Sequence, residues 1–360
     1  MLAELIILLI LFYQTYRAIL FLHQLHYCKR LTAHLPSPPS WPIFGSLFHI
    51  ERTPEGILRD LVERTNVSAA NGKDMMHIWI LHQCFCTPIT GKALKSILDS
   101  SEEIVKGNEY DVLVPWLGRG LLISTGAKWR HRRRLLTPTF HFRMLDSYVT
   151  AMNRHSKVFV DQILPDLAGR GEVDLYPYIK RCTLDIICDT AMGKQIDSQH
   201  NPSQPYVTAV MDIIRLGFEV TTKPQYWSFA ARVVSGLEHK MTKQVAVAHA
   251  FTLGVIKERI DLLNQGQRPK SIINIACTFA GYDTTASGLA WILWCFACNP
   301  DIQQRAFEEV NEVFGEDLDR DATREDLHRM EYVERCIKEA LRLFPPVPFV
   351  MRKIQKDFQS

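Results

Sequence analysis

The chain has 360 residues, of which 47% are hydrophobic and 22% are charged. That length is enough for one large or two ordinary domains with a buried core. The formal net charge of +3 is too small to favour a nucleic acid as the main partner. Nine cysteines, an odd number without zinc-like spacing, predict mostly buried free thiols on the reducing side of a membrane.

The N-terminal segment is the first organised feature. Residues 5–13 are apolar without a break, and the apolar pattern resumes after Arg17. Because a spanning helix needs roughly 20 apolar residues, residues 1–27 are predicted to form an anchor only if Arg17 is tolerated. No basic region precedes the segment and no small-x-small site follows it, which argues against a cleaved signal peptide. Lys29 and Arg30 come directly after it, so the positive-inside rule predicts a cytosolic body.

A proline-rich stretch follows the predicted anchor. Four of the seven residues 36–42 are proline, which excludes a helix and favours a stiff extended arm. The arm could be a ligand for a proline-binding domain or a rigid hinge between anchor and body. Its position favours a hinge over residues 28–45, which leaves residues 46–360 as the body.

The body is predicted to be mainly helical, with a strand-like exception at residues 76–80. Residues 301–314 form a well-punctuated helix pattern, with proline before it and glycine after it. Residues 330–344 place their apolar side chains on one helical face. Residues 271–298 contain one charged residue, Asp283, and so predict either a buried helix or a second membrane span. The polar residues crowded around Asp283 favour the buried helix.

Three short motifs in the body contain candidate functional residues. Trp129 and Arg133 lie in a basic run, Asp283 and Thr284 lie in the apolar helix, and a Glu-x-x-Arg sequence lies in the helix over 330–344. Taken singly, each has an ordinary explanation. The basic run fits a solvated face, the Asp–Thr pair fits a core-satisfying pair, and Glu-x-x-Arg fits a surface ion pair.

Taken together and in this order after a proline-rich hinge, the motifs resemble the cytochrome P450 family, in particular its invertebrate members allied to the fatty-acid ω-hydroxylases. The resemblance implies a mainly α fold with a small β region, incomplete at the C-terminus, plus an N-terminal membrane helix. It also implies a haem-thiolate monooxygenase that hydroxylates an apolar substrate such as a fatty acid, a hormone or a xenobiotic. The implied partners are NADPH–cytochrome P450 reductase and the endoplasmic reticulum membrane, and no nucleic acid.

The resemblance also assigns roles to single residues. Trp129 and Arg133 match family residues that hydrogen-bond a haem propionate, and Arg352 matches a further propionate-binding arginine. A guanidinium suits this role because its fork of donors fits a carboxylate and stays charged. Asp283 and Thr284 match the acid–alcohol pair that delivers protons to bound oxygen.

Glu339 and Arg342 match the family's buried structural ion pair. Three features of the sequence depart from the family pattern. None of the nine cysteines lies in a Phe-x-x-Gly-x-x-x-Cys loop, so no iron ligand is assigned within this chain. A haem-less truncated product, at most a membrane-bound binding protein, is therefore the alternative hypothesis. The stretch near Lys270 is shorter than in the family, which suggests an internal deletion. Ala280 replaces a glutamate that links haem covalently in many relatives, so non-covalent haem is expected.

Overall fold

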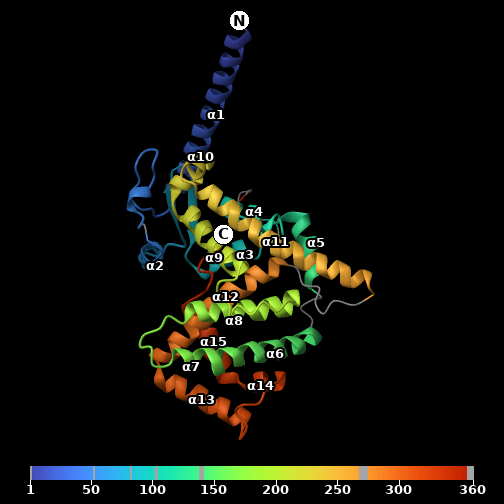
Figure 1. Cartoon of the computed structure of the whole chain (residues 1–360). Helices are drawn as coiled ribbons and strands as arrows, with labels where there is room; N and C mark the ends of the chain where they lie inside the picture. The colour runs from blue at the N-terminus through green and yellow to red at the C-terminus, as the bar shows by residue number, and fades with distance from the viewer. Residues whose placement is uncertain are drawn as a thin grey trace. The chain divides into compact units, whose positions relative to one another are not determined.

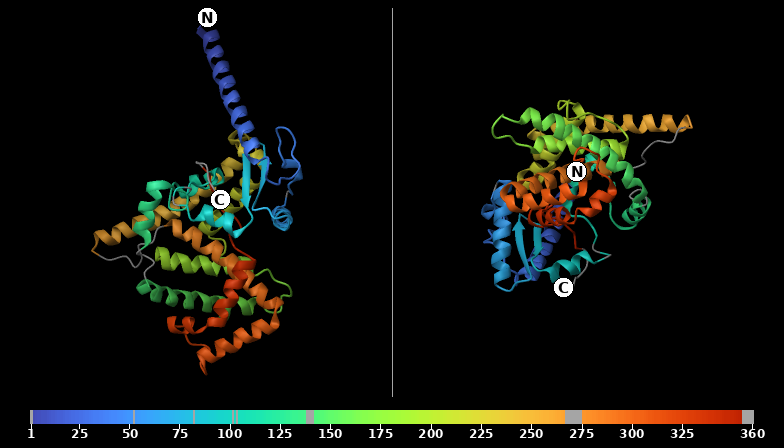
Figure 2. Two further views of the ribbon diagram at one scale, coloured as in Figure 1. Left: turned by 180° about the vertical axis from the view of Figure 1, so that it is seen from behind. Right: turned by 90° about the horizontal axis from the view of Figure 1, so that it is seen from below.

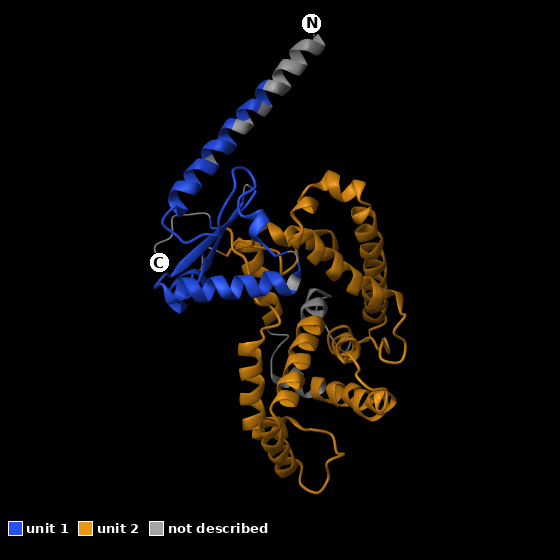
Figure 3. Cartoon of the chain, turned by 90° about the vertical axis from the view of Figure 1, so that its left-hand side faces the viewer, with its two compact units in different colours: residues 1–103, 354–360 blue, residues 104–353 orange. Residues whose placement is uncertain are grey.

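The fold is taken from a computed structural model, which describes residues 2–51, 53–81, 83–100, 102, 104–137, 142–266 and 275–354 (Figure 1). The chain forms two compact units, residues 1–103 with 354–360 and residues 104–353 (Figure 3). The sequence-based division into 1–27, 28–45 and 46–360 stays a prediction.

The first unit begins with the helix α1 (Leu2–Thr32), which is 31 residues long and has Lys29 and Arg30 in its last turn. The helix continues past residue 27, so the segment predicted as a hinge starts as helix. Within the part of the chain that the structure describes, no helix combines the length and apolarity needed to cross a membrane.

The proline-rich arm is hydrogen-bonded to a small sheet in the same unit. Strands β1 (Met75–Ile80) and β2 (Gln83–Pro88) pair antiparallel, which confirms the predicted small β region. The arm contacts β1 through the N–H of His77, which donates to the carbonyl of Pro36 at 2.9 Å. Gly45 has a φ of +62°, and a Cβ there would collide with the carbonyl oxygen of Trp79, so this close approach requires glycine. The unit also contains η1 (Leu47–His49), α2 (Pro54–Ala70) and α3 (Gly91–Leu98).

The regular elements of the second unit's described residues are helices, joined by loops and accompanied by one isolated bridge between Lys106 and Arg352. Its elements are η2 (Asn108–Leu113), α4 (Val114–Leu117), α5 (Gly126–Leu136), α6 (Phe142–Lys157), η4 (Val158–Ile163), α7 (Leu164–Leu167), α8 (Tyr176–Met192), α9 (Pro205–Thr222), η5 (Pro224–Trp227), α10 (Phe229–Val234), α11 (Leu237–Asn264), α12 (Ile275–Cys298), α13 (Pro300–Phe314), α14 (Arg324–Arg329) and α15 (Glu331–Leu343). The predicted helices over 301–314 and 330–344 are confirmed within one residue at each end.

The helix α8 is at the centre of this unit, between α6 and α12 (Figures 1 and 2). A buried core cluster joins α8 to the antiparallel pair α9 and α11, and Tyr282 of α12 belongs to it. Gly281 lets α8 and α12 approach closely, because a Cβ there would lie 2.9 Å from Cδ1 of Ile187. Residues 275–298 of the predicted apolar helix are thus a packed helix, whereas residues 271–274 lie outside the described residues, as does the junction at Lys270.

The cysteines differ from the sequence-based prediction. The described cysteines are free thiols, as expected, but only Cys182 and Cys188 among them are buried. Cys86 and Cys298 are exposed and the others are half-buried. Cys182 and Cys188 are buried because α8 is covered by neighbouring helices on several sides, which a count of cysteines cannot reveal.

Candidate active site

The carboxylate of Asp283 is held by two side chains of α8. The Nζ of Lys180 lies 2.7 Å from Oδ1 of Asp283, and the hydroxyl of Tyr176 donates to the same oxygen at 3.4 Å. The exposed fractions of the two charged side chains are 12% for Lys180 and 26% for Asp283, so the ion pair is largely shielded from water. The polar group in this apolar helix is therefore satisfied by a partner more than 100 residues earlier in the chain.

The surroundings of this ion pair are aromatic. The ammonium of Lys180 lies 5.1 Å from the ring centre of Tyr176 and 5.8 Å from that of Tyr282. Burial and the negative charge of Asp283 raise the pKa of Tyr176 to about 12, so Tyr176 is a neutral hydrogen-bond donor at neutral pH. Burial likewise raises the pKa of Tyr282, whose hydroxyl is buried without a hydrogen-bond partner.

Thr284 follows Asp283 on an uninterrupted stretch of α12 and is half-buried. Successive residues of an α-helix point about 100° apart, so Asp283 and Thr284 do not share one face. Asp283 faces α8, and its carboxylate must leave Lys180 to reach the Thr284 side of the helix. The side chain of Ala280 lies outside the described residues.

Trp129 and Arg133 lie four residues apart on α5. Because i and i+4 positions share a helical face, both can point toward one ligand, as the resemblance requires. Trp129 is half-buried and Arg133 is exposed. The helix contains six cationic or histidine side chains and no carboxylate, so its face favours an anionic group.

Arg352 lies in the segment after α15 and pairs antiparallel with Lys106. Its Nη1 is buried and has no hydrogen-bond partner. Burial, with a further contribution from the charge of Arg352, lowers the pKa of Lys106. Two cations share this place, and one buried donor is unsatisfied, so the site suits a carboxylate such as a haem propionate.

Glu339 and Arg342 form the predicted ion pair, but it is not buried. The guanidinium binds the carboxylate through two hydrogen bonds of 2.7 and 2.6 Å. The exposed fractions of the two side chains are 56% and 66%, which corrects the expectation of a buried pair. Because both side chains are exposed, water screens the attraction.

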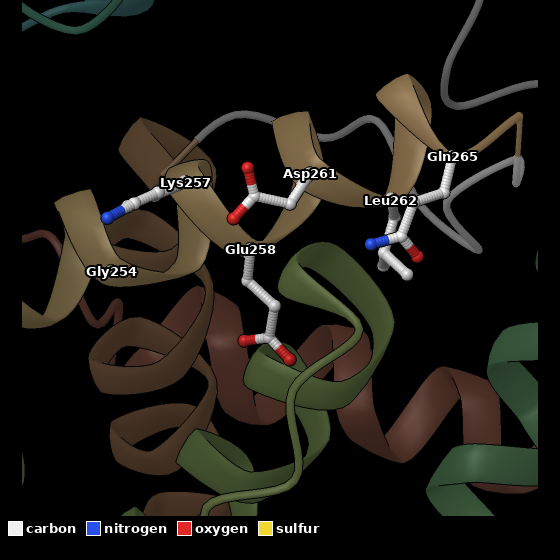
Figure 4. Close-up of a pocket in the computed structure, with 6 residues that line it drawn as sticks. All are labelled: Gly254, Lys257, Glu258, Asp261, Leu262 and Gln265. Atoms are coloured by element: carbon white, nitrogen blue, oxygen red, sulfur yellow. The ribbon is translucent and has the colours of Figure 1, made fainter.

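An open hollow of about 370 Å³ lies along the C-terminal half of α11 (Figure 4). Its lining is mostly charged or polar and contains none of the predicted site residues. Glu258, on its edge, is paired with Lys194 at 2.8 Å. The hollow is therefore a solvated surface feature, not the site that the sequence predicts.

Among the residues that the structure describes, the side chains fit one end of a haem and not the other. Arg352 offers an unsatisfied donor for a propionate, whereas an axial thiolate needs a cysteine whose pKa is lowered by positive surroundings. Burial instead raises the pKa of Cys182 to about 12 and raises that of Cys188 further, and the pKa of Cys86 is lowered by the neighbouring Cys84 thiol, not by a cation. The described cysteines therefore do not fit the axial position of a haem iron.

Sequence reasoning did not find Lys180 and Tyr176. With Thr183, whose hydroxyl donates to the carbonyl of Tyr282 at 3.0 Å, they form a polar stripe with spacings of four and three residues on α8. This stripe is the pattern that could have identified the side of α8 that faces a polar site.

Comparisons with known proteins agree with the motif order. The family profile of cytochrome P450 matches residues 35–278 and 273–359. "Cytochrome P450 4V2" of Pongo abelii is 33% identical over 356 residues, which cover 88% of this chain and 67% of that protein. "Cytochrome P450 4d2" of Drosophila melanogaster is 31% identical over 371 residues, with coverages of 92% and 73%. "Cytochrome P450 4V2" of Homo sapiens is 32% identical, with coverages of 88% and 67%.

The profile and the relatives help to choose between the two hypotheses raised by the sequence, a haem monooxygenase and a haem-less truncated product. The profile covers more than half of the chain, and its two matched segments meet beside the junction at Lys270. The relatives are family-4 proteins from insects and vertebrates and favour the enzyme over the non-catalytic alternative. The chain belongs to the cytochrome P450 family of haem monooxygenases, and its relatives place it with family 4.

Proposed function

We propose that the site around Asp283 and Thr284 serves the oxygenation of an apolar substrate, such as a fatty acid, a hormone or a xenobiotic, with electrons from NADPH–cytochrome P450 reductase. The observation that supports it best is a shielded carboxylate in the apolar helix α12, held at 2.7 Å by Lys180. When bound, haem supplies oxygen activation. Trp129, Arg133 and Arg352 are proposed to hold its propionates.

The geometry suggests how Asp283 handles a proton. In the observed state Oδ1 is ion-paired with Lys180 and accepts a hydrogen bond from Tyr176, and both keep the carboxylate on the α8 side. Rotation of the Asp283 side chain would release it toward Thr284, where a hydroxyl can pass a proton onward. Lys180 then acts as a positioning residue that sets how often the carboxylate is free.

Membrane attachment through α1 is part of the same proposal, with the body in the cytosol at the endoplasmic reticulum. The described part of α1 exposes large apolar side chains, and its last turn is basic. Apolar surface followed by cations is the pattern that the positive-inside rule predicts for an anchor and its cytosolic flank. Membrane fractionation of cells expressing the full chain, compared with a chain lacking residues 2–27, tests this. Equal recovery of both in the membrane pellet after alkaline washing would contradict it.

Haem uptake is tested by absorbance titration of the full chain in detergent. Arg352→Leu and Arg133→Leu are each expected to weaken binding by at least about tenfold, since a charge-assisted hydrogen bond contributes about 1.5–3 kcal/mol. Arg335→Leu is the matched control, because Arg335 is exposed, has its own carboxylate partner in Glu331 and lies outside the predicted site. Equal affinities in all three variants would overturn the propionate assignment. A thiolate-type spectrum of the reduced carbon monoxide complex would overturn the conclusion that the described cysteines do not fit the iron.

Catalysis is tested with the reductase, NADPH and a fatty acid, with products identified by mass spectrometry. Asp283→Asn and Thr284→Ala are expected to lower product formed per NADPH consumed, by about 10²-fold for the loss of a proton-delivery group. Asp301→Asn, on the next helix, is the control. A product yield unchanged from wild type in both site variants would contradict the role of the pair.

A further inference from the structure

Two cysteines lie side by side on β2 and have no place in the proposed function. Cys84 and Cys86 are separated by one residue, and alternate residues of a strand point to the same face. Their Sγ atoms are 3.9 Å apart and share a hydrogen bond. The spacing matches no zinc motif, and no group of three metal ligands occurs in the described part of the chain.

The two thiols have different surroundings. Cys86 is exposed, whereas Cys84 is half-buried. The hydrogen bond between them lowers the pKa of Cys86, because the Cys84 thiol donates to the Cys86 thiolate, and it raises the pKa of Cys84. Two residues at the end of α1 also affect the pKa of Cys84: Cys28 raises it and a hydrogen bond with Thr32 lowers it. An exposed thiol with a lowered pKa, beside a less exposed thiol with a raised pKa, is the arrangement of a reactive and a resolving cysteine.

We propose that Cys84 and Cys86 form a peroxide-sensitive dithiol, with Cys86 as the attacking and Cys84 as the resolving cysteine. The Cys86 thiolate attacks one oxygen of hydrogen peroxide, the O–O bond breaks, and the leaving hydroxide takes a proton to become water. Cys86 is then a sulfenic acid. The Cys84 sulfur attacks it, an S–S bond forms, and the hydroxyl leaves as a second water with the Cys84 proton. Two thiols are oxidised and one peroxide is reduced.

The strand geometry predicts that this disulfide is labile. The sulfurs must move from 3.9 Å to about 2.05 Å, while a disulfide requires closer Cβ atoms than neighbours on one face of a regular strand provide. Closure therefore bends β2 where Cys84 pairs with Trp79 and Cys86 pairs with His77. Strained, exposed disulfides are more easily reduced than structural ones, so ordinary cellular thiols should reverse the reaction. The site is thus suited to reversible modification.

The sequence provides a direct assay with an internal control. Trypsin releases residues 74–92, which contain Cys84 and Cys86 and no other cysteine. It also releases residues 182–194, which contain the buried Cys182 and Cys188. The reduced full chain in detergent is exposed to hydrogen peroxide in its native state, blocked with a maleimide, digested and analysed by mass spectrometry.

We expect peptide 74–92 to lose the mass of two hydrogen atoms and to resist the maleimide, with both effects reversed by dithiothreitol. Peptide 182–194 should react at least about tenfold more slowly, because burial disfavours its thiolates. Comparable oxidation of the two peptides would overturn the proposal. So would a cross-link between peptide 74–92 and residues 18–29, which would make Cys28 the resolving cysteine.

Two substitutions assign the roles of the thiols. Cys84→Ser should stop the reaction at the Cys86 sulfenic acid, which dimedone traps, whereas Cys86→Ser should leave Cys84 unreacted at the same peroxide dose. Equal dimedone labelling of both variants would contradict the assigned order of attack. Because both variants are read out by mass at one peptide, neither depends on haem loading or on enzyme activity.

Discussion

The ion pair between Lys180 and Asp283 gives a prediction that tests whether the pair stabilises the folded protein. Lys180→Met keeps most of the stem and removes the ammonium, which leaves the carboxylate of Asp283 without its 2.7 Å partner. Removing one partner of a buried pair costs about 3–5 kcal/mol, and an exposed pair contributes about 0–1 kcal/mol. With 12% and 26% of the two side chains exposed, we expect the free energy of unfolding to fall by about 2 kcal/mol.

Urea unfolding followed by far-UV circular dichroism measures this change, and hydrogen exchange of peptides from α8 and α12 localises it. Asp283→Asn and the double variant complete a cycle, in which we expect a coupling energy of about 1–2 kcal/mol. Arg342→Met is the matched control, because its pair has similar distances but side chains that are 56% and 66% exposed. The control should cost about 0.5 kcal/mol or less.

A loss in Lys180→Met no larger than in Arg342→Met would refute the reasoning. It would mean that the ammonium does not hold the carboxylate in solution, and the positioning role of Lys180 would fail with it. A large loss in Arg342→Met would instead show that the Glu339–Arg342 pair is shielded in solution.

Three further predictions concern stability. The pKa of Tyr176 is raised to about 12 from an ordinary 10. The stabilisation of the fold by neutral Tyr176 is therefore complete below pH 10 and is lost as the pH rises toward 12. Tyr176→Phe should flatten that alkaline loss in urea unfolding, and an unchanged slope would contradict it. Asp185 is 1% exposed and accepts the backbone N–H groups of residues 198 and 199 at 2.8 and 3.1 Å. Asp185→Ala should therefore lower the unfolding free energy by about 3 kcal/mol, and a loss below about 1 kcal/mol would argue against these bonds. The Arg320 guanidinium, with the backbone and hydroxyl of Thr323, lowers the pKa of Asp326. The ionised Asp326 carboxylate therefore stabilises the fold above its ordinary pKa near 3.8, and this stabilisation is lost as the pH falls below that value. Arg320→Met should reduce this acid sensitivity, and an identical acid profile in the variant would count against it.

The sequence alone determined the helical class, the small sheet and the family. Local patterns sufficed for these: alternation over residues 76–80, the proline and glycine that bound α13, and the apolar face of α15. Periodicity and end signals act within a few residues, so they are visible without a fold. Motif order then supplied the family.

Only the tertiary structure decided which groups meet. The sequence placed Asp283 in an apolar helix but could not name Lys180, because the partner lies on α8 and its approach depends on helix packing through Gly281. It predicted a buried Glu339–Arg342 pair, and the structure exposes it, because burial depends on what covers a helix face. The cysteines show the same division. The spacing of Cys84 and Cys86 argues against a zinc motif, but only the strand geometry shows that their sulfurs lie together. Local structure follows from neighbouring residues, whereas burial, charge pairing and thiol reactivity follow from contacts between distant ones.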